Sequence, residues 1–146
     1  MEGTAMSIDA KHDSLGLSAR IVAWYGKLAD GDVMGLLESL DRDIEWVVPD
    51  GLHFGGTYHG RDSVLANVFA RFNSEWDGFT IEPDEVFEAG DVVIALGHYR
   101  AANKATGRPM TARFAHVWRL RDGQPVRFET IPDTHAMVRT MGVEQS

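Results

Sequence analysis

The chain has 146 residues, of which 44% are hydrophobic and 25% charged, a composition typical of a single globular domain. The formal net charge of −8 argues against nucleic acid or an anionic membrane surface as the partner, because both select clustered Lys and Arg. The sequence contains no cysteine, which excludes disulfides, thiolate nucleophiles and sulfur-ligated metals.

The two ends of the chain are predicted to lie outside the folded domain. Residues 1–14 mix small, polar and charged side chains without periodicity, which predicts a disordered tail. They lack the basic start and apolar centre of a secretory signal, and no apolar run reaches the ~20 residues of a membrane span. We therefore expect a cytoplasmic protein with one domain over residues 15–137 and a C-terminal tail over residues 138–146.

Apolar residues at three- and four-residue spacing predict three helices in the first half of the chain. The first runs from Leu15 to the pair Gly31-Asp32, where glycine suits the residue after a helix and aspartate can cap the next helix. The second ends before Asp41, and the third follows Gly60. The buried stripe of the third helix is predicted to be Val64, Leu65, Val68, Phe69 and Phe72, with Arg61 and Arg71 in solvent.

A short strand over Ile44–Val48 is predicted between the second and third helices. A glycine-rich loop over residues 51–60 follows it. This loop carries His53, Phe54, Tyr58 and His59, which is an unusual density of rings for a loop. It would suit a lid over a pocket.

After Gly78 the sequence pattern changes to four long strands, predicted over Phe79–Ala89, Asp91–Ala102, Met110–Arg121 and Pro125–Ile131. The last two are joined by Asp122-Gly123, a strong hairpin signal because both central positions of a type I′ turn need positive φ. Helices followed by antiparallel strands predict an α+β fold. One curved sheet with helices on one face would enclose a cone-shaped pocket.

The third of these long strands places a titratable ring within an aromatic stripe. Residues two apart share a face of a strand, so Phe114, His116 and Trp118 lie on one side, together with Leu120. Imidazole can give or take a proton near neutral pH, which makes His116 the leading catalytic candidate. The alternative is a core histidine held by a hydrogen bond.

Several short motifs occur in the order and spacing of a known superfamily. They are Leu-x-x-Gly31-Asp32, Asp43-x-x-Trp46, Gly56-x-Tyr-x-Gly60, Gly90-Asp91-x-Val and Phe114-x-His-x-Trp-x-Leu-x-Asp-Gly123. From about Leu15 to Thr134 the chain resembles the nuclear transport factor 2-like superfamily, and within it the SnoaL-like polyketide cyclases and ketosteroid isomerase-related proteins. The resemblance implies a cone-shaped, cystatin-like α+β barrel with a mixed, mostly antiparallel sheet. It leaves the reaction open, because this scaffold serves many chemistries.

The resemblance also implies where an isomerase site would lie. The base, tyrosine and acid positions of the steroid isomerases fall on Val48, Trp24 and His116. Valine cannot abstract a proton, so the isomerase reaction in its familiar form is not expected. Tyr25, one residue from the tyrosine position, would point about 100° round the helix from Trp24.

The SnoaL-like cyclases that the chain resembles use an acid/base residue from these last strands and need no metal or organic cofactor. We therefore expect His116 to move a proton, with Tyr99 or Asp133 orienting it or polarising an oxygen. Asp133 would equally suit a helix cap. The substrate-binding candidates are Trp24, Trp46, His53, Tyr58, Phe114, Trp118 and Phe128.

Two classes of function stay open at this point. The first is a cofactor-free acid/base enzyme, an isomerase, cyclase or dehydratase, acting on a small hydrophobic polyketide-like or other cyclic carbonyl compound. The second is a non-catalytic small-molecule-binding or dimeric interaction module. Epoxide opening is not favoured, because Arg113 and His116 replace the alternating carboxylate and arginine of related hydrolases.

The remaining expectations concern metals and partners. The six histidines include no His-x-x-x-His or His-x-His pair, so no metal site is expected. Members of the superfamily are commonly homodimers. Arg113 and Arg119 would flank Ala115 and Val117 on the outer sheet face, which suits a two-fold interface between copies of the chain.

Overall fold

A computed structural model describes residues 16–142, so the predicted N-terminal tail and residues 143–146 lie outside the described part. The helical segments are α1 (Leu17–Ala29), α2 (Val33–Ser39), α3 (Arg61–Val64), η1 (Leu65–Phe69), α4 (Ala70–Ser74) and α5 (Thr134–Thr140). The strands are β1 (Glu45–Val48), β2 (Gly56–His59), β3 (Trp76–Ala89), β4 (Val92–Asn103), β5 (Pro109–Arg121) and β6 (Gln124–Pro132). Within residues 16–142 no helix has the length and apolar character needed to cross a membrane.

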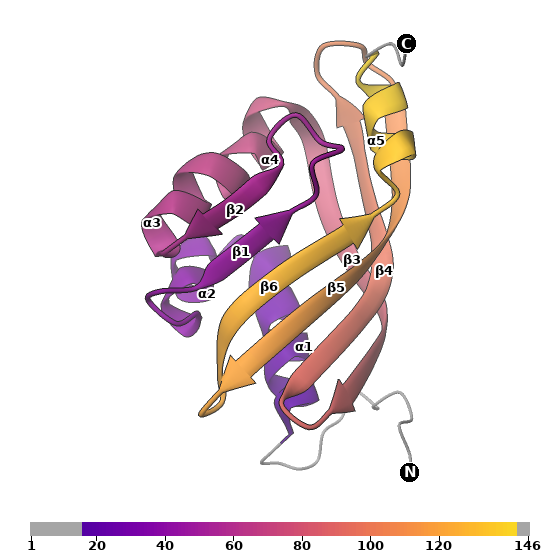
Figure 1. Ribbon diagram of the computed structural model, residues 1–146. Coiled ribbons are helices and arrows are strands. Elements are labelled where there is room, and N and C mark those ends of the chain that lie inside the picture. The colour runs from indigo at the N-terminus through magenta and orange to yellow at the C-terminus, as the bar shows by residue number, and fades with distance from the viewer. Residues whose placement is uncertain (1–15, 143–146) are drawn as a thin grey trace.

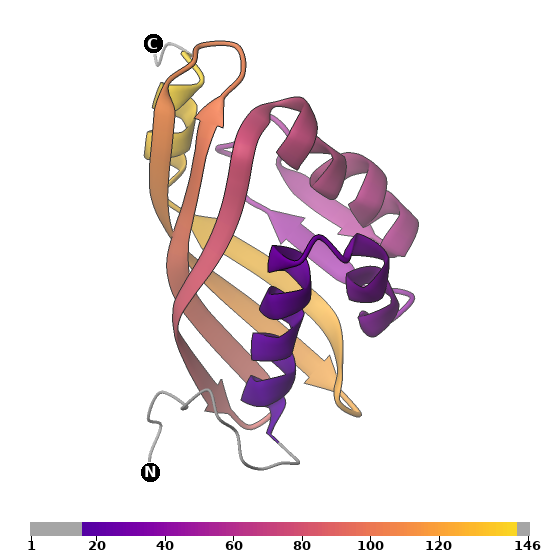
Figure 2. The same cartoon turned by 180° about the vertical axis from the view of Figure 1, so that it is seen from behind.

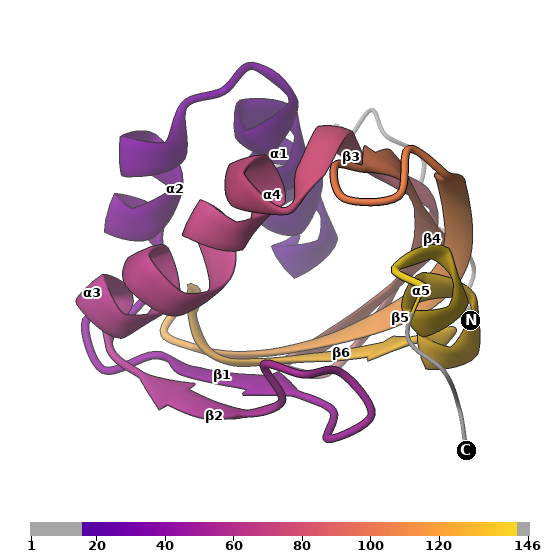
Figure 3. The same ribbon diagram turned by 90° about the horizontal axis from the view of Figure 1, so that it is seen from above.

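The predicted α+β fold is confirmed. Six strands form one curved sheet in the order β2-β1-β6-β5-β4-β3, and every neighbouring pair is antiparallel except β1 with β6 (Figure 1). Seen from behind, α1 lies across the sheet (Figure 2), and the view from above shows α1 to α4 all on the concave side (Figure 3). The core therefore fills the space between these helices and the sheet.

The hairpin between β5 and β6 matches the sequence-based prediction. Asp122 and Gly123 have φ of 54° and 79°, as a type I′ turn requires, and the strands on either side pair antiparallel. Along β5, Phe114, His116 and Trp118 are buried, whereas Arg113 and Arg119 are exposed. The predicted faces of this strand are thus correct.

The glycine-rich segment before the third helix is more ordered than predicted. Its second half forms β2, an edge strand that pairs antiparallel with β1, where Trp46 lies opposite Tyr58. A four-residue edge strand between glycines gives too short an alternation to be recognised from sequence. Similarly, Trp76 and Asp77 belong to β3 rather than to a turn, although a register irregularity follows them.

The third helix departs from a regular α-helix in its middle. The segment η1 is π-helical, so its residues turn through a smaller angle than the 3.6-residue period assumes. Leu65, predicted in the buried stripe, is consequently 37% exposed. Arg61 and Arg71, predicted in solvent, are partly buried, and the Arg61 guanidinium donates to the carbonyl of Leu40.

Two aspartates begin helices as N-caps. The Asp32 carboxylate accepts a hydrogen bond from the Gly35 N–H at 3.0 Å, which agrees with the prediction for α2. Asp133 accepts one from the Ala136 N–H at 3.0 Å and thereby caps α5. Because α5 extends to Thr140, residues 138–140 are helical rather than part of a tail.

Candidate functional site

A cavity lies between the helices and the concave face of the sheet, lined almost entirely by apolar and aromatic side chains. Its wall comprises Trp24, Trp46, Val48, Leu52, Phe54, Val68, Phe69, Arg71, Phe72, Trp76, Phe79, Ile81, Tyr99, His116, Phe128, Thr130, Pro132 and Met137. The cavity volume is about 40 Å³. That is enough for a water molecule or two, so the aromatic side chains nearly fill the cone.

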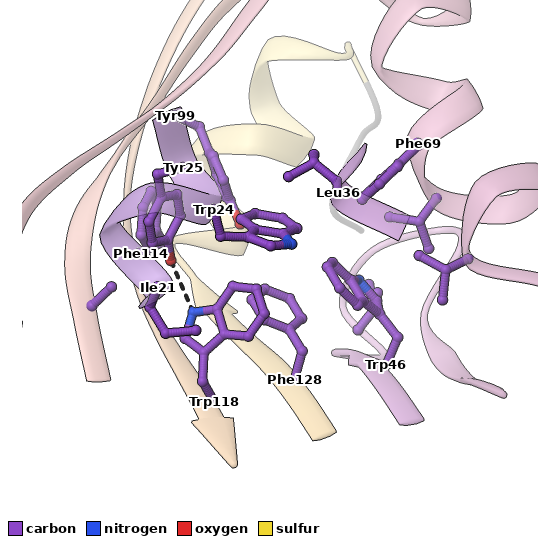
Figure 4. Packing of buried hydrophobic residues seen from close by; sticks show 14 of the residues in the cluster. Ile21, Trp24, Tyr25, Leu36, Trp46, Phe69, Tyr99, Phe114, Trp118 and Phe128 are labelled. Carbon is purple, nitrogen blue, oxygen red and sulfur yellow. Dashed lines mark hydrogen bonds between the residues drawn. The ribbon is translucent and has the colours of Figure 1, made fainter. Parts of the chain in front are cut away.

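Aromatic side chains from helices and strands meet at the base of this cavity (Figure 4). Trp46 of β1 stacks on Phe128 of β6, with ring centroids 3.9 Å apart. Trp24 of α1 packs edge-on against Trp118 of β5 at 4.7 Å. Rings contributed by four elements thus form the wall of the cavity and the layer directly behind it.

His116 faces inward and is held at both ring nitrogens. It is 1% exposed; Nδ1 lies 2.6 Å from the Tyr25 hydroxyl and Nε2 lies 2.7 Å from the Tyr99 hydroxyl. Phe114 stacks on the imidazole with centroids 3.8 Å apart and an interplanar angle of 10°. The ring is therefore fixed in both position and orientation.

The hydrogen bonds continue beyond the two tyrosines. The Trp118 indole N–H donates to the Tyr25 hydroxyl oxygen at 3.0 Å (Figure 4), and the Tyr99 hydroxyl lies 2.8 Å from the Thr130 hydroxyl. Five side chains from α1, β4, β5 and β6 thus form one buried chain, Trp118–Tyr25–His116–Tyr99–Thr130. We call it the His116 chain.

Counting donors gives the His116 chain a direction. A neutral imidazole has one donor and one acceptor nitrogen. If Nδ1 accepts from Tyr25, then Nε2–H donates to Tyr99, Tyr99 donates to Thr130, and the Thr130 hydroxyl proton is left at the cavity wall. In the opposite tautomer, Nδ1–H and the Trp118 N–H both donate to the Tyr25 oxygen, so the Tyr25 hydroxyl proton has no acceptor and lies away from the cavity. An unpaired buried donor of this kind costs about 1–3 kcal/mol. In the favoured arrangement each member of the His116 chain donates its proton to the next member in the direction of the cavity.

Burial keeps the His116 chain neutral. Desolvation lowers the pKa of His116 well below its ordinary value, because the charged imidazolium would lie among aromatic rings. Desolvation likewise raises the pKa of Tyr25 and of Tyr99 above the ordinary phenol value, with opposing contributions from the Trp118 and Thr130 hydrogen bonds respectively. At neutral pH the His116 chain therefore presents hydrogen-bond donors and carries no charge.

Tyr25 is the residue whose position the sequence did not reveal. Superfamily resemblance assigned the helix-one tyrosine position to Trp24, with Tyr25 turned away. Both residues are buried, since α1 packs into the concave sheet: Trp24 reaches the cavity, and Tyr25 reaches β5, where its hydroxyl meets His116. The two side chains point about 100° apart round the axis of α1, and both are buried in the core.

The predicted substrate-binding aromatic residues divide into two groups. Trp24, Trp46 and Phe128 line the cavity. Phe114 and Trp118 are buried behind the wall, where they position His116 and Tyr25.

Three predicted site residues lie elsewhere. Tyr58 of β2 donates its hydroxyl to the Phe54 carbonyl and is not part of the cavity wall. His53 is exposed, with Nε2 3.0 Å from a Glu75 carboxylate oxygen, and is not part of that wall either. Asp133 is exposed and engaged as the α5 cap, which corrects its placement beside His116.

Arg71 is the one charged residue in the cavity wall as far as residues 16–142 are concerned. Its guanidinium pairs with Glu75 at 2.7 Å and lies 5.0 Å from the centre of the Phe54 ring. Sequence spacing alone placed Arg71 in solvent. The i, i+4 pair with Glu75 was the available signal that its head group is held in place.

A second hollow of about 320 Å³ adjoins the cavity between the end of α1 and β3. Phe72, Phe79 and Ile81 line both spaces, and the first two stack with centroids 4.6 Å apart. These three side chains form the partition between the spaces, so their movement would enlarge the cavity. Within residues 16–142 no group of three or more His, Asp or Glu side chains is arranged to hold a metal ion.

The chain matches one known family over most of its length. The family model of the SnoaL-like domain matches residues 21–128. The chain belongs to the SnoaL-like family. No protein of curated function matches it significantly.

Solved structures agree with this assignment. An NTF2-like protein from Burkholderia thailandensis is 33% identical, with 88% of this chain and 98% of that chain covered and a TM-score of 0.83. TerC, crystallised with polyporic acid, is 30% identical, with coverage of 88% and 100% and a TM-score of 0.79. IdmH from Streptomyces antibioticus, a candidate polyketide cyclase, is 24% identical, with coverage of 88% and 100% and a TM-score of 0.72; at that identity it shows the fold alone.

Proposed function

We propose that this SnoaL-like domain is a cofactor-free acid/base enzyme, an isomerase, cyclase or dehydratase, acting on a small hydrophobic cyclic carbonyl compound. The observation that carries the proposal is the His116 chain, which ends at the cavity wall with a hydroxyl donor. TerC, a relative of the same fold, was crystallised with polyporic acid, which supports an organic ring compound as the ligand class.

In this proposal the Tyr99 hydroxyl turns from Thr130 to the carbonyl oxygen of the ligand. The hydrogen bond stabilises negative charge on that oxygen as a neighbouring C–H bond breaks, and the released proton passes to water. A solvent proton then returns to the carbon; burial raises the pKa of Tyr99 and so keeps its proton on the phenol, while His116 Nε2–H holds the Tyr99 oxygen in place. Tyr99 is thus the hydrogen-bond donor to the ligand oxygen, and His116 positions it.

The cavity must widen to admit such a ligand, since its volume is about 40 Å³. Displacement of Phe72 and Phe79 would join it to the adjoining hollow of about 320 Å³. The combined volume exceeds the ~300 Å³ at which the range of ordinary small-molecule sites begins.

The proposal is tested by the exchange of the α-protons of cyclohexanone with deuterium in D₂O, followed by ¹H NMR. We expect the wild-type protein to accelerate exchange above buffer, and Tyr99→Phe to reduce the acceleration by about 10²- to 10³-fold, as for loss of an oxyanion donor. Tyr58→Phe is the matched control, because its hydroxyl lies outside the cavity wall. It should retain the wild-type rate.

Two results would redirect the proposal. Binding of cyclohexanone without any acceleration of exchange would favour the non-catalytic ligand-binding module. Undiminished exchange by folded Tyr99→Phe would remove Tyr99 and His116 from the mechanism while leaving catalysis itself in place.

A further inference from the structure

Trp24 carries a buried hydrogen-bond donor without an acceptor. The side chain is 4% exposed, and its indole Nε1 has no hydrogen-bond partner. The other three tryptophans have no buried unpaired nitrogen among the described residues, and Trp118 uses its N–H on Tyr25. A buried N–H group without a partner is uncommon in folded proteins, and a water or ligand molecule in the adjoining cavity can supply the acceptor that the chain lacks.

The Trp24 side chain lines the same cavity as the end of the His116 chain, and it also borders another hollow beside Gly123. Trp24, Tyr99 and Thr130 all line the cavity. Figure 4 shows the Trp24 nitrogen directed away from Tyr25 and Trp118, toward the space between Phe69 and Trp46. The wall therefore holds two donors at separate places, the Tyr99–Thr130 hydroxyls and the Trp24 N–H, with hydrocarbon around them.

We propose that Trp24 Nε1–H binds a second acceptor oxygen of the ligand, so that the cavity selects a cyclic compound with two oxygens on opposite parts of its ring. One oxygen would take the Tyr99 or Thr130 hydroxyl and the other the indole N–H. This inference rests on the proposed function only in taking the cavity as the ligand site. It assigns Trp24 a role in ligand selection and none in proton transfer.

The test compares cyclohexane-1,4-dione, which has two acceptor oxygens, with cyclohexanone, which has one. Dissociation constants are measured for the wild-type protein, Trp24→Phe and the control Trp76→Phe, which makes the same change at another tryptophan of the cavity wall. We expect Trp24→Phe to weaken the dione by about 3- to 10-fold, the loss of one hydrogen bond, and to change cyclohexanone by less than twofold. Trp76→Phe should affect both ligands equally.

A second measurement needs no substitution in the protein that binds the ligand. In ¹H–¹⁵N spectra of the wild type, the indole N–H resonance of Trp24, assigned from its loss in Trp24→Phe, should move downfield with the dione and stay in place with cyclohexanone. Equal weakening of both ligands by Trp24→Phe, an unmoved Trp24 resonance, or failure of the wild type to bind the dione would each overturn the inference.

The deuterium-exchange assay separates this inference from the proposed function. If Trp24→Phe discriminates between the two ligands while no exchange is catalysed, the selection role stands and the enzyme proposal fails. If exchange is catalysed without that discrimination, the enzyme proposal stands and the role of Trp24 fails.

Discussion

At the scale of single residues, His116 combines full burial with a hydrogen bond at each ring nitrogen. Protonation would turn the accepting nitrogen into a second donor and force one tyrosine hydroxyl to reorient. The ring is thus coupled to Tyr25 and Tyr99 through its protonation state. This coupling gives His116 a measurable effect on stability.

We expect the folded protein to lose stability as the pH falls below about 6.5, the ordinary histidine pKa. The folded-state pKa of His116 is lowered, so the unfolded chain binds a proton that the folded chain does not, and stability falls with pH down to the folded-state pKa. The slope from this residue is at most about 1.4 kcal/mol per pH unit. Urea unfolding of wild type and His116→Gln between pH 5 and 8 measures it.

The glutamine variant serves as the internal control, since all other titrating groups are shared and cancel in the difference. The free energies of unfolding of the two proteins should converge as the pH falls. Parallel curves would mean that His116 does not titrate between the folded and unfolded states.

Alternation along β5 grouped His116 with the aromatic face, and the superfamily resemblance associated Tyr99 with it; in the structure both side chains point inward. The Tyr25 contact could not be predicted, because a helix buried on two sides brings residues 100° apart into the core, and periodicity shows only the mean direction of the stripe. Asp133 is different. Its sequence context suited both a catalytic group and a cap, and only the position of α5 distinguishes them.

At the scale of elements, the role of Asp133 is to cap the N-terminus of α5. Asp133→Ala should destabilise the protein by about 0.5–2 kcal/mol through loss of the cap, as measured by thermal or urea unfolding. Asp133→Asn keeps a capping side chain and removes the carboxylate, so both stability and cyclohexanone exchange should stay near wild type. A large loss of exchange in a stable Asp133→Asn protein would restore Asp133 as a catalytic candidate.

Gly97 of β4 allows the backbone of β3 and the ring of Phe114 to approach β4 closely. A Cβ atom at this position would clash with the Glu82 carbonyl oxygen and lie 2.7 Å from Cζ of Phe114, the ring that stacks on His116. Gly97→Ala should therefore destabilise the protein by about 1–3 kcal/mol, the range for overpacking, and shift the His116 ring resonances. Both effects can be followed by unfolding and NMR.

Gly26→Ala in α1 is the matched control for Gly97→Ala. A Cβ atom there meets nothing within 4 Å, and alanine is the better helix former by about 1 kcal/mol. Gly26→Ala should therefore stabilise the protein. Equal effects of the two substitutions would contradict the close approach at Gly97.

Element prediction succeeded where the local signal was strong and failed where tertiary pairing decided. The Asp122-Gly123 turn and the long strands follow from turn chemistry and alternation. The π-helical segment η1 and the edge strand β2 leave no comparable periodicity, because each spans five residues or fewer. Arg71 reached the cavity wall through the irregular turn of that same helix.

At the scale of the whole molecule, the outer sheet face carries apolar side chains with no covering layer in the described chain. Ile131 of β6 is 53% exposed and lies opposite Ala115 of β5, next to Val117 and the exposed Arg113. We propose that this face forms the two-fold interface of a homodimer, in keeping with the superfamily resemblance.

Ile131→Glu should convert the dimer to a monomer, because it places a charge beside Ala115 in the proposed interface. Light scattering after gel filtration would then change from twice the chain mass of 16.2 kDa to that mass. Met34→Glu is the control, since Met34 is 62% exposed on α2, away from the sheet. A monomeric wild type, or a dimer that tolerates Ile131→Glu, would contradict the proposal.

The parallel pairing of β1 with β6 has a consequence for how the protein is made. Trp46 finds its sheet partner, Phe128, only after the ribosome has added more than half of the chain. Until then β1 and β2 can form only an isolated two-stranded ribbon, which is marginally stable in water. Folding is therefore expected to be completed late, and a nascent chain stalled before β6 should remain a target for chaperones and proteases.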